Sequence, residues 1–575
     1  MAESKQNAGA FEFVVGVTGH RDLILEHVPA LKKSIRDALD GLAGHFDSMP
    51  LRIITGLAEG ADTLVTEVAL EMGIEVTALL PMPEEVYEAD FEGDALSRFR
   101  NLVKDPRINT IELPLVGGPS AADFDDQSNR DDQYDLLKDY LVRRSNVLLA
   151  LWDGEVSELR GGTSDVVMSY LCGEVGLPAP CKIPAGSDAA QDCGEFVVCI
   201  QTPRQSSTKT VKPSGYAFLV SNSTCVAYSQ MDQVPEYYTH RWSGLDAYAS
   251  ERFSDASLAH PTYPLVGSEE SCLDEHTYAV EREFLRADQL AMSSQKLSDA
   301  LFKCFGVIAA AMGLFFLVYA KLAALKLFLV IYIVLFFAGY IAFRVSAKKR
   351  WLARHLACRA LAETLRVQFF LLISSAGQKF SVRRMLRLTS VDRFDGFEWL
   401  QDAARCAEPL FHKDDNEIER LEVVRNKWID DQAQYFTKKL AQMHTQHARL
   451  EVVKSLLLAG SILGALSLIF FKKSLLHMEM AGYDGKALLV FAMGLLPLWL
   501  AVWELYQGKM ATRELIWQYS NQRRYFVAAS RQITEAKDIS AKRRVVSHLA
   551  EQALAEIYLW SAHRYHREHE PPAAG

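Results

Sequence analysis

Hydrophobic and polar positions alternate in blocks over residues 1–204. Short apolar runs rich in β-branched residues at 13–17, 51–55 and 74–80 each end at a turn of small residues or proline. Between the first two, residues 29–42 repeat apolar positions at helical spacing. Such a succession predicts strand–helix units joined by short turns. Further predicted elements are strands at 108–113, 147–152 and 197–200 and helices at 61–72, 131–144 and 165–172. The pattern therefore predicts an α/β, Rossmann-like domain with a doubly wound parallel sheet.

Glycine-bearing turns follow several of these strands. Glycine lets a backbone approach a ligand closely, and amide groups at a helix N-terminus attract anions. Because the carboxyl ends of parallel strands meet at one edge of a sheet, these turns predict a nucleotide pocket there. The alternative is a set of ordinary tight turns in an α/β sheet. The candidate binding residues are Gly16, Thr18, Gly19, His20, Arg21, Gly56, Glu59, Gly60, Arg143, Arg144, Asp153, Gly161, Gly162, Thr163 and Asp165.

The arginines in this set would form planar, bidentate contacts to phosphate, and surface salt bridging is the alternative. His20, Glu59 and Asp165 could serve as a general acid/base set for cleavage of an N-glycosidic bond. They could equally hydrogen-bond a ribose or fix the loops. Tyr87 is a candidate for stacking on a base, or simply part of the core.

Four later stretches are almost wholly apolar, at 304–319, 327–343, 453–471 and 487–505. Each, with its flanks, reaches the ~20 residues needed to cross a bilayer. The first two are joined by only a few residues, so we expect two helical hairpins in a lipid bilayer. Lys and Arg residues follow the second and fourth stretches, which predicts that both termini are cytoplasmic.

The domain organisation follows from these blocks. We expect an α/β domain at 1–204 and a loop-rich insertion or linker at 205–284. Two helix–hairpin–helix units at 285–380 and 420–567 then flank a connecting segment at 381–419, and 568–575 is expected to be a disordered tail. The apolar pattern continues from 275 into the first membrane stretch, which predicts one uninterrupted helix. We therefore expect an all-α transmembrane domain with four membrane helices after the α/β domain.

Charge and cysteine content exclude several classes of function. The chain carries 62 basic and 72 acidic residues, a balance unlike that of a basic nucleic-acid-binding domain. Nine cysteines occur without a CxxC pair, so we expect no metal site and no bound cofactor. The first ten residues have neither an apolar core nor a basic start, so we expect no secretory signal there.

The ordered motifs of the α/β part resemble the SLOG family. They are GVTGHRD at 16–22, ITGLAEGAD at 54–62, LLPMP at 79–83, RRSNVLLALWDG at 143–154 and GGTSDV at 161–166. That family is a Rossmann-like group that senses or processes nucleotides, related to DNA-processing protein A and the LOG phosphoribohydrolases. The LOG motif has a Pro-Gly-Gly turn and a Glu where this chain has Trp152-Asp153-Gly154 and Asp165. These departures favour binding over catalysis, and a membrane-anchored LOG-like phosphoribohydrolase is the alternative.

The two helix–hairpin–helix units resemble the SLATT family of two-helix membrane effectors, which is associated with SLOG sensors. The resemblance implies a bacterial anti-phage effector in the inner membrane. A nucleotide-derived second messenger, such as a cyclic ADP-ribose-like molecule or a cyclic oligonucleotide, would bind the α/β domain. The membrane part would then open a pore or disrupt the membrane, causing growth arrest or cell death. We also expect a homo-oligomer, since several sensors could share the ligand energy needed to switch the membrane part.

Overall fold

The structure is a computed structural model. It describes residues 11–116, 124, 126–157, 159–173, 178–184, 193–206, 215–222, 227–251, 264–266, 275–323, 325–375, 385, 386, 389, 393–407, 417–472, 475, 479, 480, 482–510 and 512–569. The chain divides into two compact units. The α/β unit comprises Met1–Arg286 and Leu361–Leu421, and the helical unit comprises Ala287–Ala360 and Glu422–Gly575.

A nine-stranded sheet in the order β4-β3-β2-β1-β5-β7-β8-β9-β6 forms the centre of the α/β unit. Its strands are β1 (Phe13–Gly19), β2 (Leu51–Thr55), β3 (Glu75–Leu80), β4 (Ile108–Glu112), β5 (Val147–Trp152), β6 (Cys181–Lys182), β7 (Cys193–Gln201), β8 (Tyr216–Asn222) and β9 (Ala227–Met231). Strands β1 to β5 and β7 pair in parallel, whereas β8 is antiparallel to both of its neighbours. The predicted parallel α/β sheet is thus confirmed.

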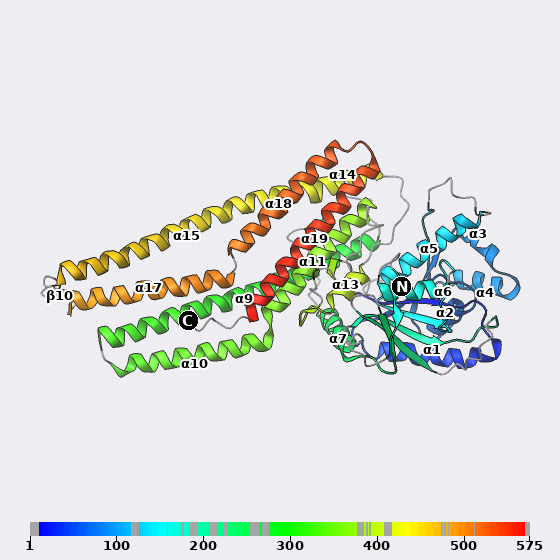
Figure 1. The fold of residues 1–575 in the computed structure, drawn as a ribbon, viewed down its shortest axis with the longest axis horizontal. Coiled ribbons are helices and arrows are strands. Elements are labelled where there is room, and N and C mark those ends of the chain that lie inside the picture. The colour runs from blue at the N-terminus through cyan, green and yellow to red at the C-terminus, as the bar shows by residue number, and fades with distance from the viewer. Residues whose placement is uncertain are drawn as a thin grey trace. The chain divides into compact units, whose positions relative to one another are not determined.

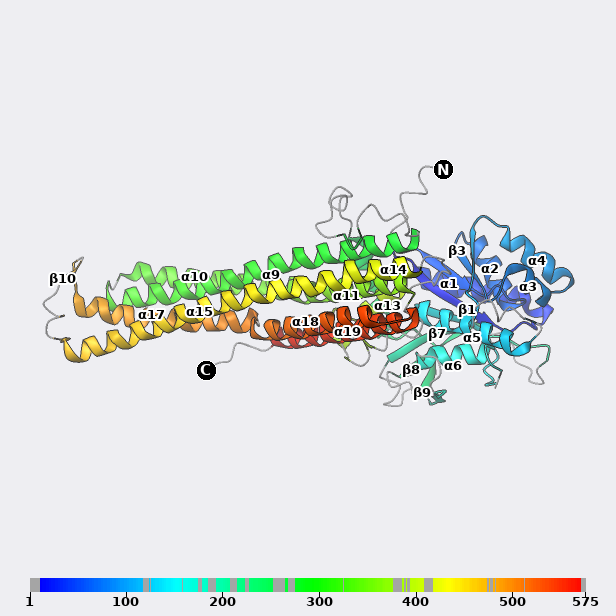
Figure 2. The same ribbon diagram turned by 90° about the horizontal axis from the view of Figure 1, so that it is seen from above.

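Helices cover both faces of this sheet (Figures 1 and 2). The helices of the α/β part are α1 (Val28–Ala43), α2 (Ala61–Glu71), α3 (Glu84–Tyr87), α4 (Gly93–Val103), α5 (Gln127–Arg144), α6 (Thr163–Cys172) and α7 (Glu236–Ser250). On one face α5 and α6 bury Leu141, Val167 and Leu171 against Leu148 of β5 and Val197 of β7. Alternate residues of β1 face opposite sides of the sheet, so Val14 joins that cluster while Phe13 contacts Trp242 of α7.

The chain reverses its direction across the sheet between β1 and β5. Strands β2, β3 and β4 extend on one side of β1, and β5 and β7 extend on the other. Such a reversal leaves a crevice beyond the carboxyl ends of the two strands, which is the usual ligand position in open α/β sheets.

The described residues of 205–284, the region expected as a loop-rich insertion or linker, include regular secondary structure. They contribute β8, β9 and α7, and helix α9 begins at Glu275. Buried aromatic residues of β8 and α7, such as Phe218 and Trp242, pack around Phe196 of β7. Strand β8 carries a local signal in its apolar run at 217–220, whereas β9 has little, and antiparallel pairing with β8 gives β9 its structure.

Among the described residues, four helices are long and apolar enough to cross a membrane, as predicted. The long helices in Figure 2 are α9 (Glu275–Lys321), α10 (Lys326–Lys349), α15 (Asp431–Phe470) and α17 (Gly485–Met510). The further helical elements after α7 are α11 (Trp351–Ser374), α13 (Leu400–Cys406), α14 (Glu417–Val424), a π-helical stretch (Arg425–Asp430), α18 (Thr512–Glu535) and α19 (Ile539–His569). Of these, α13 lies within the α/β unit. The predicted uninterrupted helix from 275 into the first apolar stretch is α9. Residues 570–575 of the expected disordered tail lie outside the described residues.

Glycines allow the apolar helices of the two hairpins to pack closely. A Cβ on Gly313 of α9 would lie 2.5 Å from the Leu498 side chain of α17, and one on Gly494 of α17 would lie 3.0 Å from Leu317 of α9. Gly464 of α15 similarly faces Met493 of α17. Small residues at such crossings are typical of helix packing within membranes.

Candidate functional site

A pocket of about 230 Å³ opens at the switch between β1 and β5. The turn after β1, the inner face of α5 and the first turn of α6 form most of its wall. Its lining residues include Thr18, Gly19, His20, Arg21, Asp22, Asp62, Tyr87, Tyr134, Lys138, Glu155, Gly161, Gly162, Thr163 and Arg204. The crevice predicted from the strand order is therefore a cavity in the structure.

The turns after β1 and β2 are locked together beside this pocket. Gly60, with φ +87°, lies so close to the first turn that a Cβ would approach the carbonyl oxygen of Arg21 to 2.3 Å. A Cβ on Gly19 would come equally close to the Cβ of Ala61. The Ala61 amide, at the start of α2, donates to the carbonyl oxygen of His20 at 3.0 Å. Gly19 and Gly60 thus allow the two turns to pack against each other. The Ala61 amide already donates within the protein, so it is not available to a ligand.

His20 is buried and lies against Asp153, the residue after β5. The backbone N–H of Asp153 donates to Nε2 of His20 at 3.1 Å, and Oδ1 of Asp153 lies 3.2 Å from the same nitrogen. The amide calls for a lone pair on Nε2, whereas the carboxylate oxygen calls for a proton there, so one tautomer satisfies only one of the two contacts. Burial lowers the pKa of His20, the Asp153 carboxylate opposes that shift, and Arg204 adds to it. His20 therefore ties the turn after β1 to the residue that follows β5.

Arg21 projects into the pocket and contacts Tyr134 of α5. One guanidinium nitrogen donates to the Tyr134 hydroxyl at 3.2 Å, and the guanidinium carbon lies 5.6 Å from the ring centroid. The Tyr134 hydroxyl in turn donates to Asp90, which also pairs with Arg130. Within the described part of the chain, no carboxylate forms an ion pair with Arg21. This exposed guanidinium is therefore available to an anion.

Two further cations line the pocket and are paired within the protein. Nζ of Lys138 contacts Asp165 at 2.7 Å and Asp135 at 2.9 Å. Arg204, which follows β7, contacts Asp22 at 3.0 Å. These pairs reduce the positive charge that Lys138 and Arg204 present to a ligand.

Asp62 is a buried carboxyl in the first turn of α2. Burial raises its pKa to about 6, although hydrogen bonds to Thr55 and Ala58 and the charge of Arg21 oppose the shift. Its neighbour Tyr87 is fully buried and donates its hydroxyl to the carbonyl oxygen of Gly56 at 3.0 Å. Tyr87 therefore supports the turn after β2 while its ring closes one side of the pocket.

The structure brings about half of the sequence-predicted site residues to this pocket. Those that line it are Thr18, Gly19, His20, Arg21, Gly161, Gly162 and Thr163. Four others support the lining without forming part of it. Asp153 contacts His20, Gly60 packs on Arg21, Gly56 accepts from Tyr87, and Asp165 accepts from the Gly161 amide and binds Lys138.

The remaining candidates lie elsewhere. Gly16 lies within β1, where a Cβ would collide with Ser145, and Glu59 is exposed outside the lining. Arg143 and Arg144 end α5, and the next strand, β5, begins at Val147. They therefore lie at the amino end of β5, whereas the pocket lies beyond its carboxyl end, which corrects their assignment to the pocket.

Sequence reasoning missed several lining residues. Arg204 carried a signal, because it follows a predicted strand at the carboxyl edge of the sheet. Asp62 lay in a motif but was assigned only to the start of a helix. Tyr134 and Lys138 sit on the polar face of α5, and nothing in the local pattern separates them from solvated neighbours.

The fold and pocket define an α/β unit with a ligand crevice, in a chain with four membrane-length helices. A comparison with models of known protein families gives no match, and a comparison with curated proteins gives none either.

Proposed function

We propose that this protein is a nucleotide-responsive membrane effector of bacterial anti-phage defence. A nucleotide-derived messenger binds the pocket of the α/β unit, and binding makes the membrane helices permeable, which arrests or kills the cell. The motif resemblances to SLOG and SLATT proteins supply the biological setting.

The observation that carries the binding part is the guanidinium of Arg21. It is exposed in a pocket at the switch point of a parallel sheet, held by Tyr134, with no carboxylate paired to it among the described residues. Arg–phosphate contacts are charge-assisted and bidentate, so a phosphate here would complete the pairing that Arg21 lacks. The N-terminal turn of α6, with Gly162 at its N-cap, lines the same pocket and favours an anion through its amides, although Asp165 in that turn already accepts from the Gly161 amide.

The membrane part of the proposal requires energy from ligand binding. A near-complete switch between two states needs roughly 5.5 kcal/mol of differential affinity. In a monomer, a single pocket of about 230 Å³ would have to supply this whole difference in binding free energy. A homo-oligomer would distribute the requirement over several pockets, so the proposal includes self-association in the bacterial inner membrane.

The alternative, a membrane-anchored LOG-like phosphoribohydrolase, is kept because of Asp62. A buried carboxyl with a raised pKa at a pocket is a typical general acid. The acid/base set expected from the sequence is less favourable, since Asp165 binds Lys138 and Glu59 lies outside the lining.

Purified full-length protein separates these functions. Isothermal titration with AMP, ADP-ribose, cyclic ADP-ribose and cyclic di-AMP would identify a binder, and chromatography of the same mixtures would detect released base. Arg21→Ala should weaken binding of the positive probe at least about tenfold, because one charge-assisted pair contributes about 1.5–3 kcal/mol. Arg36→Ala is the matched control, since Arg36 forms an exposed pair with Glu71 on the opposite side of α1 from the core.

The outcomes are distinct. Base released at turnover rates would favour the hydrolase. Binding without product, followed by leak of dye from proteoliposomes, would support the effector. If none of the four probes bound, or if Arg36→Ala weakened binding as much as Arg21→Ala, the proposed role of this pocket would be wrong.

A further inference from the structure

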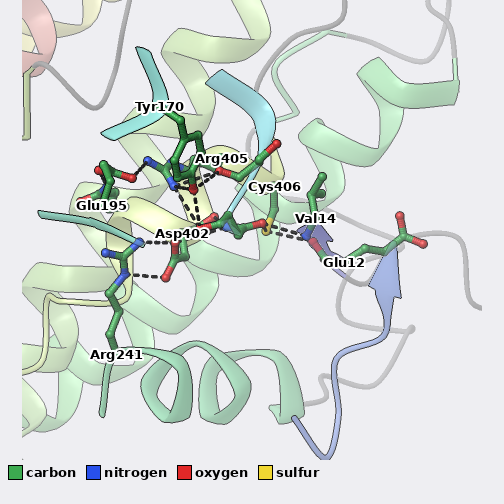
Figure 3. A network of polar contacts seen from close by, with 11 residues as sticks. Glu12, Val14, Tyr170, Glu195, Arg241, Asp402, Arg405 and Cys406 are labelled. Atoms are coloured by element: carbon green, nitrogen blue, oxygen red, sulfur yellow. Dashed lines mark hydrogen bonds and ion pairs between the residues drawn. The ribbon is translucent and has the colours of Figure 1, made fainter. Parts of the chain in front are cut away.

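A buried polar network joins helix α13 to the sheet of the α/β unit (Figure 3). In the chain, α13 belongs to the segment between the two membrane hairpins, because α10 precedes it and α15 follows it. No local pattern predicts α13 near the sheet, because its partners there and on α7 lie 161 to 394 positions away.

The first half of the network centres on Asp402. Its carboxylate pairs with both Nε and Nη2 of Arg241, from α7, in a fork geometry. Both side chains are almost completely buried, with 0% and 2% exposure. The backbone oxygen of Asp402 accepts from Nδ2 of Asn146 at 3.0 Å. Because both charges are removed from water, this geometry specifies one position for α13 on α7 and β5.

The second half centres on Arg405, one turn further along α13. Its Nη2 binds the carboxylate of Glu195 on β7 at 2.5 Å. Its Nη1 donates to the carbonyl oxygen of Ser145 at 2.9 Å and contacts the Tyr170 hydroxyl at 3.0 Å. Gln401 donates to the other oxygen of Glu195 at 3.0 Å. Arg405 thus satisfies the backbone immediately before β5.

The strands held by α13 are the strands that form the pocket. Asn146 precedes β5 and accepts from the Val14 amide of β1 at 2.9 Å. At the opposite ends of β1 and β5 lie His20 and Asp153, beside the pocket. A strand of six residues spans about 20 Å, so pocket and α13 lie at the two ends of one short, rigid pair of strands.

We propose that α13 is a reversible latch, docked on the amino ends of β1 and β5, through which the α/β unit restrains the segment between the two membrane hairpins. The chemistry of the contact supports reversibility. Water compensates buried ion pairs when they separate, so they fix a position strongly while contributing little net stability. Helix α13 is also short, with seven residues, so its contacts with the rest of the α/β unit, polar and apolar, decide its position rather than its own hydrogen bonds.

The reactivity of Cys406, at the end of α13, offers a measure of whether α13 is docked in the native chain. Its thiol donates to the carbonyl oxygen of Glu12 at 3.2 Å and lies 3.6 Å from Oδ1 of Asn146. The residue is partly exposed, but burial of the thiol raises its pKa well above the ordinary value. Only the thiolate reacts with alkylating reagents, so docking suppresses reaction at Cys406. Undocking would expose the thiol and accelerate alkylation.

The test measures alkylation at each cysteine of the full chain in detergent, resolved by mass spectrometry. Asp402→Asn keeps the shape of the side chain but leaves Arg241 buried without its counter-charge. It should accelerate alkylation of Cys406 at least about tenfold. Asp246→Asn is the matched control on α7, because Asp246 is only half-buried and accepts hydrogen bonds from the Asp47 and Ser48 amides, away from the network of α13. It should leave the Cys406 rate within about twofold.

Cys199 of β7, which is buried in the sheet, controls for unfolding. The latch requires Cys406 to react faster in Asp402→Asn while Cys199 remains protected. Acceleration at both cysteines would mean that α13 is an inseparable part of the fold, and an unchanged Cys406 would mean that the network does not hold it; either result overturns the latch. The double variant Arg241→Met/Asp402→Leu removes both charges and should return Cys406 to within about threefold of the wild type.

Discussion

The side-chain amide of Asn146 donates to the backbone oxygen of Asp402 across 256 positions of sequence. The same amide accepts from the Val14 N–H through Oδ1. One buried side chain therefore joins the start of β1, the start of β5 and α13. Contacts of this kind place residues from the segment between the hairpins inside the α/β unit.

Substitution of Asn146 should lower the stability of the α/β unit. Asn146→Ala leaves the Val14 N–H and the Asp402 carbonyl without their present partner in a buried site, which costs about 1–3 kcal/mol. We expect a fall of several degrees in the unfolding temperature of the α/β unit, measured by near-ultraviolet circular dichroism in detergent. Asn109→Ala, at an exposed position of β4, should change it little. Equal shifts in the two variants would contradict the importance of the buried amide.

Gly60 and Gly73 offer a matched pair for testing the contact between the two turns. Both have positive φ, +87° and +75°, but only Gly60 faces another backbone. Gly73→Ala should cost about 1 kcal/mol from backbone strain alone. Gly60→Ala adds a collision with the Arg21 carbonyl and should cost more than about 3 kcal/mol in the free energy of unfolding. Denaturant titrations would measure both, and similar values would show that the close approach has no energetic role.

The elements that the sequence predicts correctly are those whose signal lies in neighbouring residues. Runs such as 51–55 and 147–152 are apolar because both faces of a parallel strand are buried, and that signal survives in a single sequence. The turns at Gly19 and Gly161 are predictable because glycine is common where the chain turns sharply or another element approaches closely. The apolar runs of the membrane helices are equally local.

What the sequence could not reveal depends on distant partners. In the sequence, Asp402 and Arg405 resemble solvated charges on a short polar helix. In the structure both are buried, and each forms an ion pair with a distant residue, Arg241 or Glu195. The same limitation explains the misassignment of Arg143 and Arg144. A motif match placed them at the pocket, whereas the direction of α5 places them at the opposite end of β5.

Asp62 makes the stability of the α/β unit depend on pH. Burial raises its pKa from 3.8 to about 6, so the folded state holds the proton more tightly than the unfolded state. Stability therefore falls as pH rises from 3.8 through about 6, and the complete loss is about 3 kcal/mol. Asp62→Asn should stabilise the protein more at pH 7.5 than at pH 5. Urea titrations at the two pH values would test this, and an equal effect at both would contradict the raised pKa.

The orientation of the membrane helices is testable with fusions. If the four membrane-length helices all cross the bilayer, they return the chain to its starting side, and Lys348 and Lys349 in the last turn of α10 favour the cytoplasm. A fluorescent protein fused after Gly575 should therefore fluoresce in a bacterial host, while alkaline phosphatase fused there should be inactive. Alkaline phosphatase inserted after Leu322, between α9 and α10, should be active. The reverse pattern would require an inverted topology.

Helix α9 gives the sharpest test of coupling between nucleotide binding and the membrane part. It runs from Glu275 to Lys321 without a break, and its first turns are fixed in the α/β unit. There Arg286 donates to the carbonyl oxygens of Tyr248, Ala249 and Glu251 at 2.6–2.8 Å, and so caps α7. A continuous helix can transmit a displacement or rotation, whereas a glycine tether cannot.

Four glycines inserted after Ser294 should therefore leave the affinity for the positive nucleotide probe nearly unchanged while abolishing probe-dependent dye leak from proteoliposomes. Each glycine costs about 1 kcal/mol in a helix, so the insertion favours a local break. Four alanines at the same site are the control, because they lengthen α9 by about 6 Å and keep it helical. Probe-dependent leak should persist to a measurable extent with alanine. Leak that stayed dependent on the probe with glycine as well would exclude α9 as the mechanical route and leave the other crossings between the two units, which lie within α11 and α14 on either side of α13.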